Sequence, residues 1–301
     1  MRIPPYLKKG DTIGLICPSG YMPLENVQTC VLTLKKWGYQ VVVGNTVGHQ
    51  NNYFSGTDEE RLADLQKMLD DKNINAILCA RGGYGLSRII DKIDFTSFKK
   101  NPKWIIGYSD ITLLQSHIHT NLNIASLHSP MAAAFNDGGD KNEYIKVLQK
   151  ILKGSKQKYS CIAHSFNNLG KVEAELVGGN LSLIAHSIGS ASSFQTKNKI
   201  LFIEDIGEYL YHIDRLFVQL KRSGLLKAIK GLILGGFTDM KDTVIPFGKN
   251  IDALIYEHTK DLNIPVCFHF PVGHQTENYP LKIGVKYQLE ITSKKVSLKE
   301  I

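Results

Sequence analysis

The sequence predicts an α/β protein whose first half forms a parallel β-sheet covered by helices on both faces. Short, continuous apolar runs alternate with amphipathic stretches of helical spacing. Apolar runs of this kind are typical of parallel strands that are buried on both sides. The chain has 301 residues, which is the length of about two domains.

The elements of the first half follow one another in order. A strand at residues 12–17 ends at Pro18-Ser19-Gly20, and Thr57 with Glu60 forms a capping box that predicts a helix to about residue 69. Further strands are expected at residues 41–43, 76–80 and 103–108, and further helices at 27–37, 86–93 and 111–120. In open sheets of this kind, sites lie at the carboxyl ends of the strands.

The second half contains more strands and ends in a predicted hairpin. Strands are expected at residues 172–177, 200–203, 231–237 and 265–270, helices at 181–188 and 210–220, and the two hairpin strands at 287–292 and 295–299. A lysine-rich helix between the halves is the candidate connection. We therefore predict a first domain at residues 1–150, a linker at 151–170 and a second domain at 171–301.

Composition and charge exclude several classes of protein. Apolar residues make up 43% of the chain and charged residues 21%, as in an ordinary globular protein rather than a disordered or fibrous one. The net charge is +8, but lysine and arginine are scattered along the sequence. A nucleic-acid-binding protein gathers its positive charge on one face, so no nucleic-acid partner is expected.

The cysteines and the apolar segments predict a cytoplasmic protein without metal or membrane anchor. Five cysteines form no CxxC pair, which is typical of reduced thiols rather than disulfides or zinc ligands. Charged residues and prolines interrupt the first 14 residues, and no run approaches the ~18 apolar residues of a membrane span. No HExxH motif is present, and His117 and His119 point to different faces of a helix.

Ser109 is the first candidate for chemistry, because it lies between an apolar strand and a helix. A serine in such a turn exposes its hydroxyl above the sheet edge, and the N–H of Asp110 points to where an oxyanion would form. The helix N-terminus adds a partial positive charge there. The alternative is that Ser109 only caps the helix. The GxSxG pattern is incomplete, since Ile111 replaces its second glycine.

A glycine-rich loop, Arg81-Gly82-Gly83-Tyr84-Gly85, follows the predicted strand at 76–80. Its glycines allow backbone N–H groups to approach a ligand closely. Neither the P-loop nor the dinucleotide spacing is present, so a second oxyanion donor is the functional interpretation. A tight packing turn is the alternative.

Glu204 and His274 are the candidate acid and base. Glu204-Asp205 ends an apolar strand, where a buried carboxylate must find a partner. A salt-bridged strand end is the alternative, and Glu208 and Asp214 are nearby competitors. His274 follows Gly273 in a polar loop, and an imidazole suits a general base at neutral pH.

These motifs together resemble the LD-carboxypeptidase family, the serine peptidases of family S66, which includes the microcin-C self-immunity hydrolases. They follow the family's order and span residues 10 to about 285. The segments concerned are residues 10–14 (GDTIG), 18–19 (PS), 81–85 (RGGYG), 107–112 (GYSDIT), 175–181 (ELVGGNL), 202–205 (FIED), 235–237 (GGF) and 273–274 (GH).

The resemblance implies a Rossmann- or flavodoxin-like N-terminal domain that bears the nucleophile and a β-rich C-terminal α/β domain that bears the acid and base. It implies a catalytic triad of Ser109, His274 and Glu204, with backbone N–H groups of Asp110 and Gly83 as oxyanion donors. It also implies no cofactor and a homodimer.

The implied reaction is that of peptidoglycan recycling in the cytoplasm. The enzyme would hydrolyse the amide between the L-centre of a diamino acid and the terminal D-alanine of a muropeptide tetrapeptide. The alternative within the family is an amidase that cleaves aminoacyl-nucleotide conjugates. Such an enzyme needs an aromatic platform for the base, and the only tryptophans are Trp37 and Trp104, both in predicted elements of the first domain.

Overall fold

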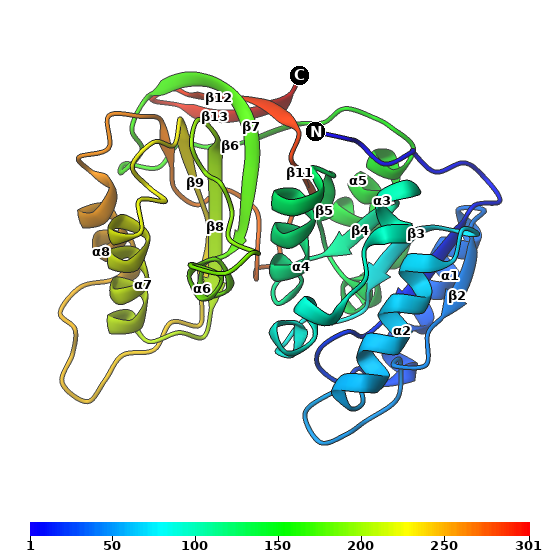
Figure 1. The fold of residues 1–301 in the computed structure, drawn as a ribbon. Helices are drawn as coiled ribbons and strands as arrows, with labels where there is room; N and C mark the ends of the chain where they lie inside the picture. The colour runs from blue at the N-terminus through cyan, green and yellow to red at the C-terminus, as the bar shows by residue number, and fades with distance from the viewer. The chain divides into compact units, whose positions relative to one another are not determined.

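The chain folds into two units, each built around its own β-sheet (Figure 1). The structure is a computed structural model that describes all 301 residues. Unit 1 comprises Met1–Ser155 and Tyr279–Lys282, and unit 2 comprises Lys156–Asn278 and Ile283–Ile301.

Unit 1 contains a six-stranded sheet in the order β11-β5-β4-β3-β1-β2, with β1 to β5 all parallel. The order 2-1-3-4-5 of these five strands is that of flavodoxin-like folds. The strands are β1 (Thr12–Ile16), β2 (Gln40–Val43), β3 (Ile74–Cys79), β4 (Trp104–Gly107), β5 (Ser126–His128) and β11 (Leu281–Ile283).

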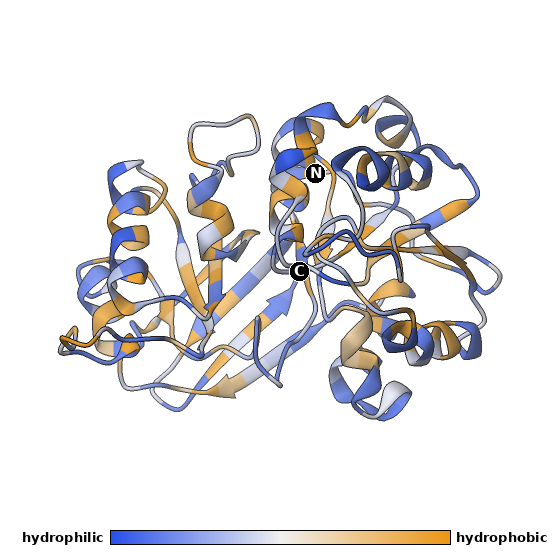
Figure 2. Ribbon diagram, turned by 90° about the horizontal axis from the view of Figure 1, so that it is seen from below, coloured by the Kyte–Doolittle hydropathy of each residue, from blue (hydrophilic) through white to orange (hydrophobic).

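Helices connect the parallel strands of unit 1, and α2 packs on both β1 and β3. Figure 2 shows many helices with an apolar and a polar side, as expected where one face is buried against a sheet. The α-helices are α1 (Gln28–Lys36), α2 (Asp58–Asp70), α3 (Thr96–Lys100), α4 (Ile111–His117) and α5 (Glu143–Leu152). The shorter turns are η1 (Leu24–Val27), η2 (Leu86–Arg88), η3 (Ile90–Lys92), η4 (Ile118–Leu122), η5 (Ala132–Asn136) and η6 (Gly139–Lys141).

Unit 2 contains a seven-stranded mixed sheet in the order β10-β9-β8-β7-β12-β13-β6. Strands β7 to β10 are parallel, whereas β7, β12, β13 and β6 pair antiparallel. The strands are β6 (Lys158–Ile162), β7 (Gly170–Asn180), β8 (Ile200–Ile206), β9 (Gly231–Thr238), β10 (Val266–Cys267), β12 (Lys286–Ile291) and β13 (Lys295–Glu300). Its helices are α6 (Leu181–His186), α7 (Leu210–Arg222) and α8 (Ile251–Thr259).

The predicted fold class is confirmed: the first unit is a parallel α/β sheet, and the second is a strand-rich α/β unit. The predicted capping box of Thr57 and Glu60 is present at the start of α2. The terminal hairpin is also present, as β12 and β13. The predicted domain boundaries at residues 150 and 171 stay predictions. None of the helices combines the length and the apolar composition needed to cross a lipid bilayer.

Two predicted elements differ from the structure. The helix expected at residues 86–93 is instead two 3₁₀ turns, η2 and η3, because Ile89 has φ −122° and ψ −17°, outside α-helical geometry. The strand expected at residues 265–270 is limited to β10. His269 adopts the left-handed backbone conformation, with φ +55°, which a strand does not accommodate.

Several short elements were not predicted, namely α3, β5, β6, α8 and β11. Most have too few residues to show a clear period. Residues Tyr279–Lys282, which include most of β11, belong to unit 1 although they follow nearly all of unit 2 in the sequence. No local pattern signals such a return.

Candidate functional site

Ser109 lies in a strained turn between β4 and α4. Its backbone has φ +65°, a left-handed conformation that costs a residue with a side chain about 1–3 kcal/mol and persists only where the surroundings impose it. The N-cap position of α4 belongs to Asp110, and no side chain caps the helix. Ser109 is therefore not a simple helix cap. It stands on a sharp turn between a strand and a helix, as sequence analysis predicted for this segment.

The Asp110 side chain ties this turn to two neighbouring loops. Its buried carboxylate accepts hydrogen bonds from the Ser19 hydroxyl at 2.6 Å and from the Leu86 N–H at 2.9 Å. Ser19 follows β1, and Leu86 follows the glycine-rich loop after β3. One carboxylate thus connects the carboxyl ends of β1, β3 and β4, where sites of parallel sheets lie.

The glycine-rich loop packs directly against Ser109. A Cβ atom on Gly82 would lie 2.8 Å from the Ser109 Cβ and 3.2 Å from the Asp110 nitrogen, so only glycine fits there. Gly83 has φ +101°, which favours glycine for conformational reasons. The Gly82 carbonyl also accepts a hydrogen bond from the Gly20 N–H at 3.0 Å. The loop is therefore held against the serine turn by backbone contacts.

In unit 2, the buried Glu204 and the partly buried His274 form a hydrogen-bonded pair. Glu204 lies in β8 and is fully buried. Its Oε2 atom lies 2.6 Å from the His274 Nδ1 atom and accepts the His274 backbone N–H at 3.0 Å. The two bonds fix both the position of the loop and the orientation of the ring. With Nδ1–H directed at the carboxylate, Nε2 becomes the basic nitrogen of the imidazole.

Two glycines allow this close approach. Gly273 has φ +106°, and a Cβ atom there would lie 2.5 Å from the Glu204 Cβ. A Cβ atom on Gly235, in the neighbouring strand β9, would lie 2.4 Å from the Val272 carbonyl oxygen and 3.1 Å from the Glu204 Cβ. The glycines of the GGF and GH segments thus make room for the acid and for the loop that carries the base.

Electrostatics favour a protonatable imidazole at this position. Burial by itself lowers the pKa of His274, but the hydrogen bond to Glu204 and the charges of Glu204 and Asp205 outweigh it, so the pKa lies above its ordinary value. Burial and the adjacent Glu204 carboxylate raise the pKa of Asp205 to about 6. The pair can therefore accept a proton and stabilise the resulting imidazolium.

The other carboxylates in this region have different partners. Asp205 accepts hydrogen bonds from the Asn180 amide at 2.8 Å and from the Ser182 N–H and hydroxyl at 2.9 and 2.8 Å, at the start of α6. Glu208 pairs with His212, and Asp214 lies 2.7 Å from the His258 ring. Of the four candidate acids, it is Glu204 whose carboxylate lies within hydrogen-bond distance of the His274 ring.

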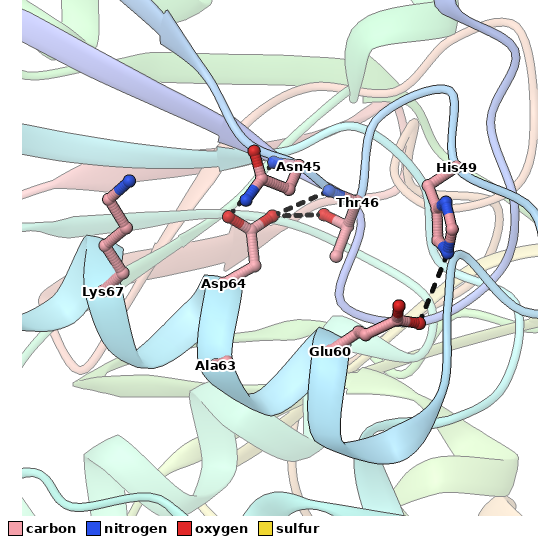
Figure 3. A pocket seen from close by; sticks show the side chains of 7 residues that line it. All are labelled: Asn45, Thr46, His49, Glu60, Ala63, Asp64 and Lys67. Atoms are coloured by element: carbon pink, nitrogen blue, oxygen red, sulfur yellow. Dashed lines mark hydrogen bonds and ion pairs between the residues drawn. The ribbon is translucent and has the colours of Figure 1, made fainter.

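A separate polar pocket of about 300 Å³ lies in unit 1, between the loop after β2 and α2 (Figure 3). Asp64 lines it and accepts hydrogen bonds from the Asn45 and Thr46 N–H groups at 3.2 and 3.0 Å and from the Thr46 hydroxyl at 2.6 Å. These bonds hold the loop after β2, so the buried carboxylate has a structural role.

Each unit thus assembles its own part of the predicted site. Unit 1 brings together Ser109, Asp110 and the glycine loop, and unit 2 brings together Glu204 and His274. Sequence reasoning did not identify Ser19, the Asp110 side chain or Gly82 as contacts of the serine turn. The position of Ser19 just after β1 could have predicted its contact with this turn, because the parallel strands β1, β3 and β4 end at the same edge of the sheet.

Comparisons with known proteins place these features in one family. The LD-carboxypeptidase N-terminal domain profile matches residues 13–129, and the C-terminal domain profile matches residues 173–289. A Bacillus subtilis protein named "Probable murein peptide carboxypeptidase" is 35% identical over 294 residues, which cover 97% of this chain and 92% of that protein. The Escherichia coli protein named "Microcin C7 self-immunity protein MccF" is 27% identical, covering 98% of this chain and 94% of that protein.

A solved structure is also similar. The crystal structure of muramoyltetrapeptide carboxypeptidase from Oxalobacter formigenes matches with a TM-score of 0.87 and 28% sequence identity. The match covers 96% of this chain and 98% of the other.

Proposed function

Because the chain belongs to the LD-carboxypeptidase family, the S66 peptidases, we propose that it is a serine L,D-carboxypeptidase of murein peptides. Its substrate is a muropeptide tetrapeptide, and the bond hydrolysed joins the L-centre of the diamino acid to the terminal D-alanine. The observation that carries the proposal is the left-handed backbone of Ser109 between β4 and α4. Strain of this kind in a turn that presents a hydroxyl is typical of an activated nucleophile.

In the proposed mechanism, the Ser109 hydroxyl attacks the carbonyl carbon of the scissile amide. His274 Nε2 takes the hydroxyl proton and then gives it to the departing D-alanine nitrogen. Glu204 holds the ring in the required tautomer and stabilises the imidazolium. Water, activated by the same imidazole, hydrolyses the acyl-enzyme and regenerates Ser109.

The oxyanion formed in each step is assigned to backbone N–H groups of Asp110 and Gly83. The proximity of Gly82 to the Asp110 nitrogen supports this assignment, since it brings the glycine loop beside the first donor. Two such donors are usual for acyl transfer, and loss of one costs about 10²–10³ in rate. We also propose that the two predicted domains share the catalytic residues, with the nucleophile in residues 1–150 and the acid and base in residues 171–301.

We further propose that the enzyme acts in the cytoplasm on recycled peptides and forms a homodimer. All five cysteines are free thiols, which suits a reducing compartment. The dimer rests on the family resemblance. Light scattering of the purified 33.6 kDa chain should give twice the monomer mass, and a monomer at all concentrations would remove this part of the proposal.

The second candidate is an amidase of aminoacyl-nucleotide conjugates, which the similarity to the self-immunity protein favours. The tryptophans argue against it. Trp104 is fully buried, stacks on Tyr6 and donates its indole N–H to the Pro5 carbonyl. Trp37 packs against Phe135 in unit 1. The carboxypeptidase is therefore the preferred function.

The test is release of D-alanine from a muropeptide tetrapeptide by the purified full chain, compared with cleavage of an aminoacyl-nucleotide amide. We expect D-alanine release by the wild type and a loss of about 10⁴-fold or more in Ser109→Ala. Ser97→Ala, in α3 at the opposite end of β4, is the control and should remain active. Full activity of Ser109→Ala, or cleavage of the nucleotide amide alone, would contradict the proposal.

A further inference from the structure

A cluster of two histidines and one aspartate lies in unit 2 and shares no residue with the Glu204–His274 pair. His164 follows β6, Asp252 lies in the first turn of α8, and His269 follows β10. Their candidate ligand atoms all lie within 4.8 Å of one another. The Asp252 Oδ2 atom lies 2.9 Å from the His269 Nε2 and 3.9 Å from the His164 Nε2. Ligand atoms around one tetrahedral zinc ion lie about 3.3 Å apart, so small side-chain adjustments would bring all three to one ion.

The side chains of the cluster are oriented by their surroundings. The His164 ring stacks on Phe268, with ring centroids 5.6 Å apart, and lies 4.8 Å from the His269 ring. His269 is placed by its left-handed backbone, with φ +55°. That conformation is uncommon for a residue with a side chain, and such strain clusters at functional sites. Asp252 belongs to a helix capped by Asn250.

We propose that His164, Asp252 and His269 bind one zinc ion or a similar first-row transition metal ion. Two imidazole nitrogens and one carboxylate oxygen suit zinc, nickel or copper, whereas magnesium and calcium take oxygen ligands. The His269 side chain is 59% exposed and the other two are 28% exposed, so water can complete the coordination. The metal joins three segments that are far apart in the sequence.

Binding requires a change of tautomer at two ligands. In the metal-free protein, the Nε2–H of His269 is directed at the Asp252 Oδ2, and coordination through Nε2 moves that proton to Nδ1. The His164 Nδ1 accepts the Phe166 N–H at 3.3 Å, which places the His164 proton on Nε2. Coordination through Nε2 gives up this long hydrogen bond and moves the proton to Nδ1. Each ring then binds zinc as a neutral imidazole that carries its proton on Nδ1.

The inference does not depend on the proposed catalytic activity, and its test measures metal binding. Chelator-treated full-length protein is titrated with zinc chloride by calorimetry. We expect one zinc ion per chain, a rise of the melting temperature with zinc and no comparable effect of magnesium. Absence of zinc binding at ten times the protein concentration would overturn the proposal.

Variants identify the ligands. His269→Gln and Asp252→Asn should each weaken zinc binding at least tenfold while the metal-free proteins remain folded by circular dichroism. His49→Gln, which removes a histidine paired with Glu60 in unit 1, is the matched control and should bind as the wild type does. Zinc binding that survives in His269→Gln, or that is lost in His274→Ala, would place the metal elsewhere and overturn the assignment. A shift of the His164 ring ¹⁵N resonances on zinc addition supports it, and unchanged resonances contradict it.

Discussion

Unit 1 and unit 2 position the proposed catalytic side chains by different physical means. Ser109 is positioned by its backbone, which is left-handed and packed against Gly82. Glu204 lies in β8, is fully buried, and positions His274 through two hydrogen bonds from one carboxylate oxygen. The serine turn depends on a backbone conformation and on the absence of a side chain at Gly82, whereas the pair in unit 2 depends on the hydrogen-bonding groups of both Glu204 and His274.

Among changes to the groups that position Ser109 and His274, the largest effect should come from the Glu204–His274 pair. Glu204→Gln keeps the size of the residue but can present an amide N–H to the His274 Nδ1, which favours the wrong tautomer. An analogous Asp→Asn change in a serine protease lowers kcat about 10⁴-fold, and we expect a loss of that order, measured as D-alanine release under saturating substrate.

The control is Glu257→Gln, which removes an exposed partner of Lys249 and should leave kcat within about twofold, as surface ion pairs contribute little. Near-normal activity of Glu204→Gln would show that the ring is oriented by something other than this carboxylate.

A smaller effect is expected from weakening the hydrogen bonds that hold the serine turn to its neighbouring loops. Asp110→Asn replaces the carboxylate oxygen Oδ2, which accepts from both Ser19 and Leu86, with a neutral amide oxygen. Hydrogen bonds to an ionised acceptor are about twice as strong as those to a neutral one. The glycine loop should then hold its oxyanion donors less well, and kcat should fall about 10- to 100-fold with little change in KM, less than the loss of a whole donor.

Asp64→Asn is the matched control, because Asp64 is also a buried carboxylate that holds a loop of unit 1 (Figure 3). It should lower the free energy of unfolding without lowering kcat. Equal kcat losses in the two variants would mean that Asp110 contributes only stability.

The pH dependence of kcat/KM reports on the protonation of His274 in unit 2. A general base must be neutral, so activity should fall as the pH drops through the pKa of His274. Because that pKa is raised, the midpoint of the acid limb should lie above the reference value of about 6.5. A profile without an acid limb between about pH 5 and 8, or with its midpoint below the reference value, would contradict the role of His274.

The smallest expected effect is a shift of that acid limb in Asp205→Asn. The charge of Asp205 contributes to the raised pKa of His274, so removing it should move the midpoint to lower pH, by less than about one unit. The variant also changes the bonds to Asn180 and Ser182, so its unfolding is measured in parallel. An acid limb whose midpoint does not move would show that the charge of Asp205 does not contribute to the pKa of His274.

The two regions were also predictable to different degrees. Ser109 stands at a strand-to-helix turn that apolar runs and a helical period reveal locally. The residue pattern did not decide which acid pairs with His274. The four candidates lie in one short stretch of sequence, namely Glu204, Asp205, Glu208 and Asp214. Only the pairing of β8 with β9, and the loop that follows β10, brings Glu204 to His274.

The sequence by itself determined the order of strands and helices, the capping box of α2, the terminal hairpin and the ordered motifs of the family. These depend on interactions between residues close together along the chain, which leave a periodic or spaced pattern. The tertiary structure alone decided the left-handed turn of Ser109, its contact with Gly82, the bonds of Asp110 to Ser19 and Leu86, and the return of β11 to the sheet of unit 1. Each of these depends on which strand ends become neighbours in space, and no local pattern of residues specifies that.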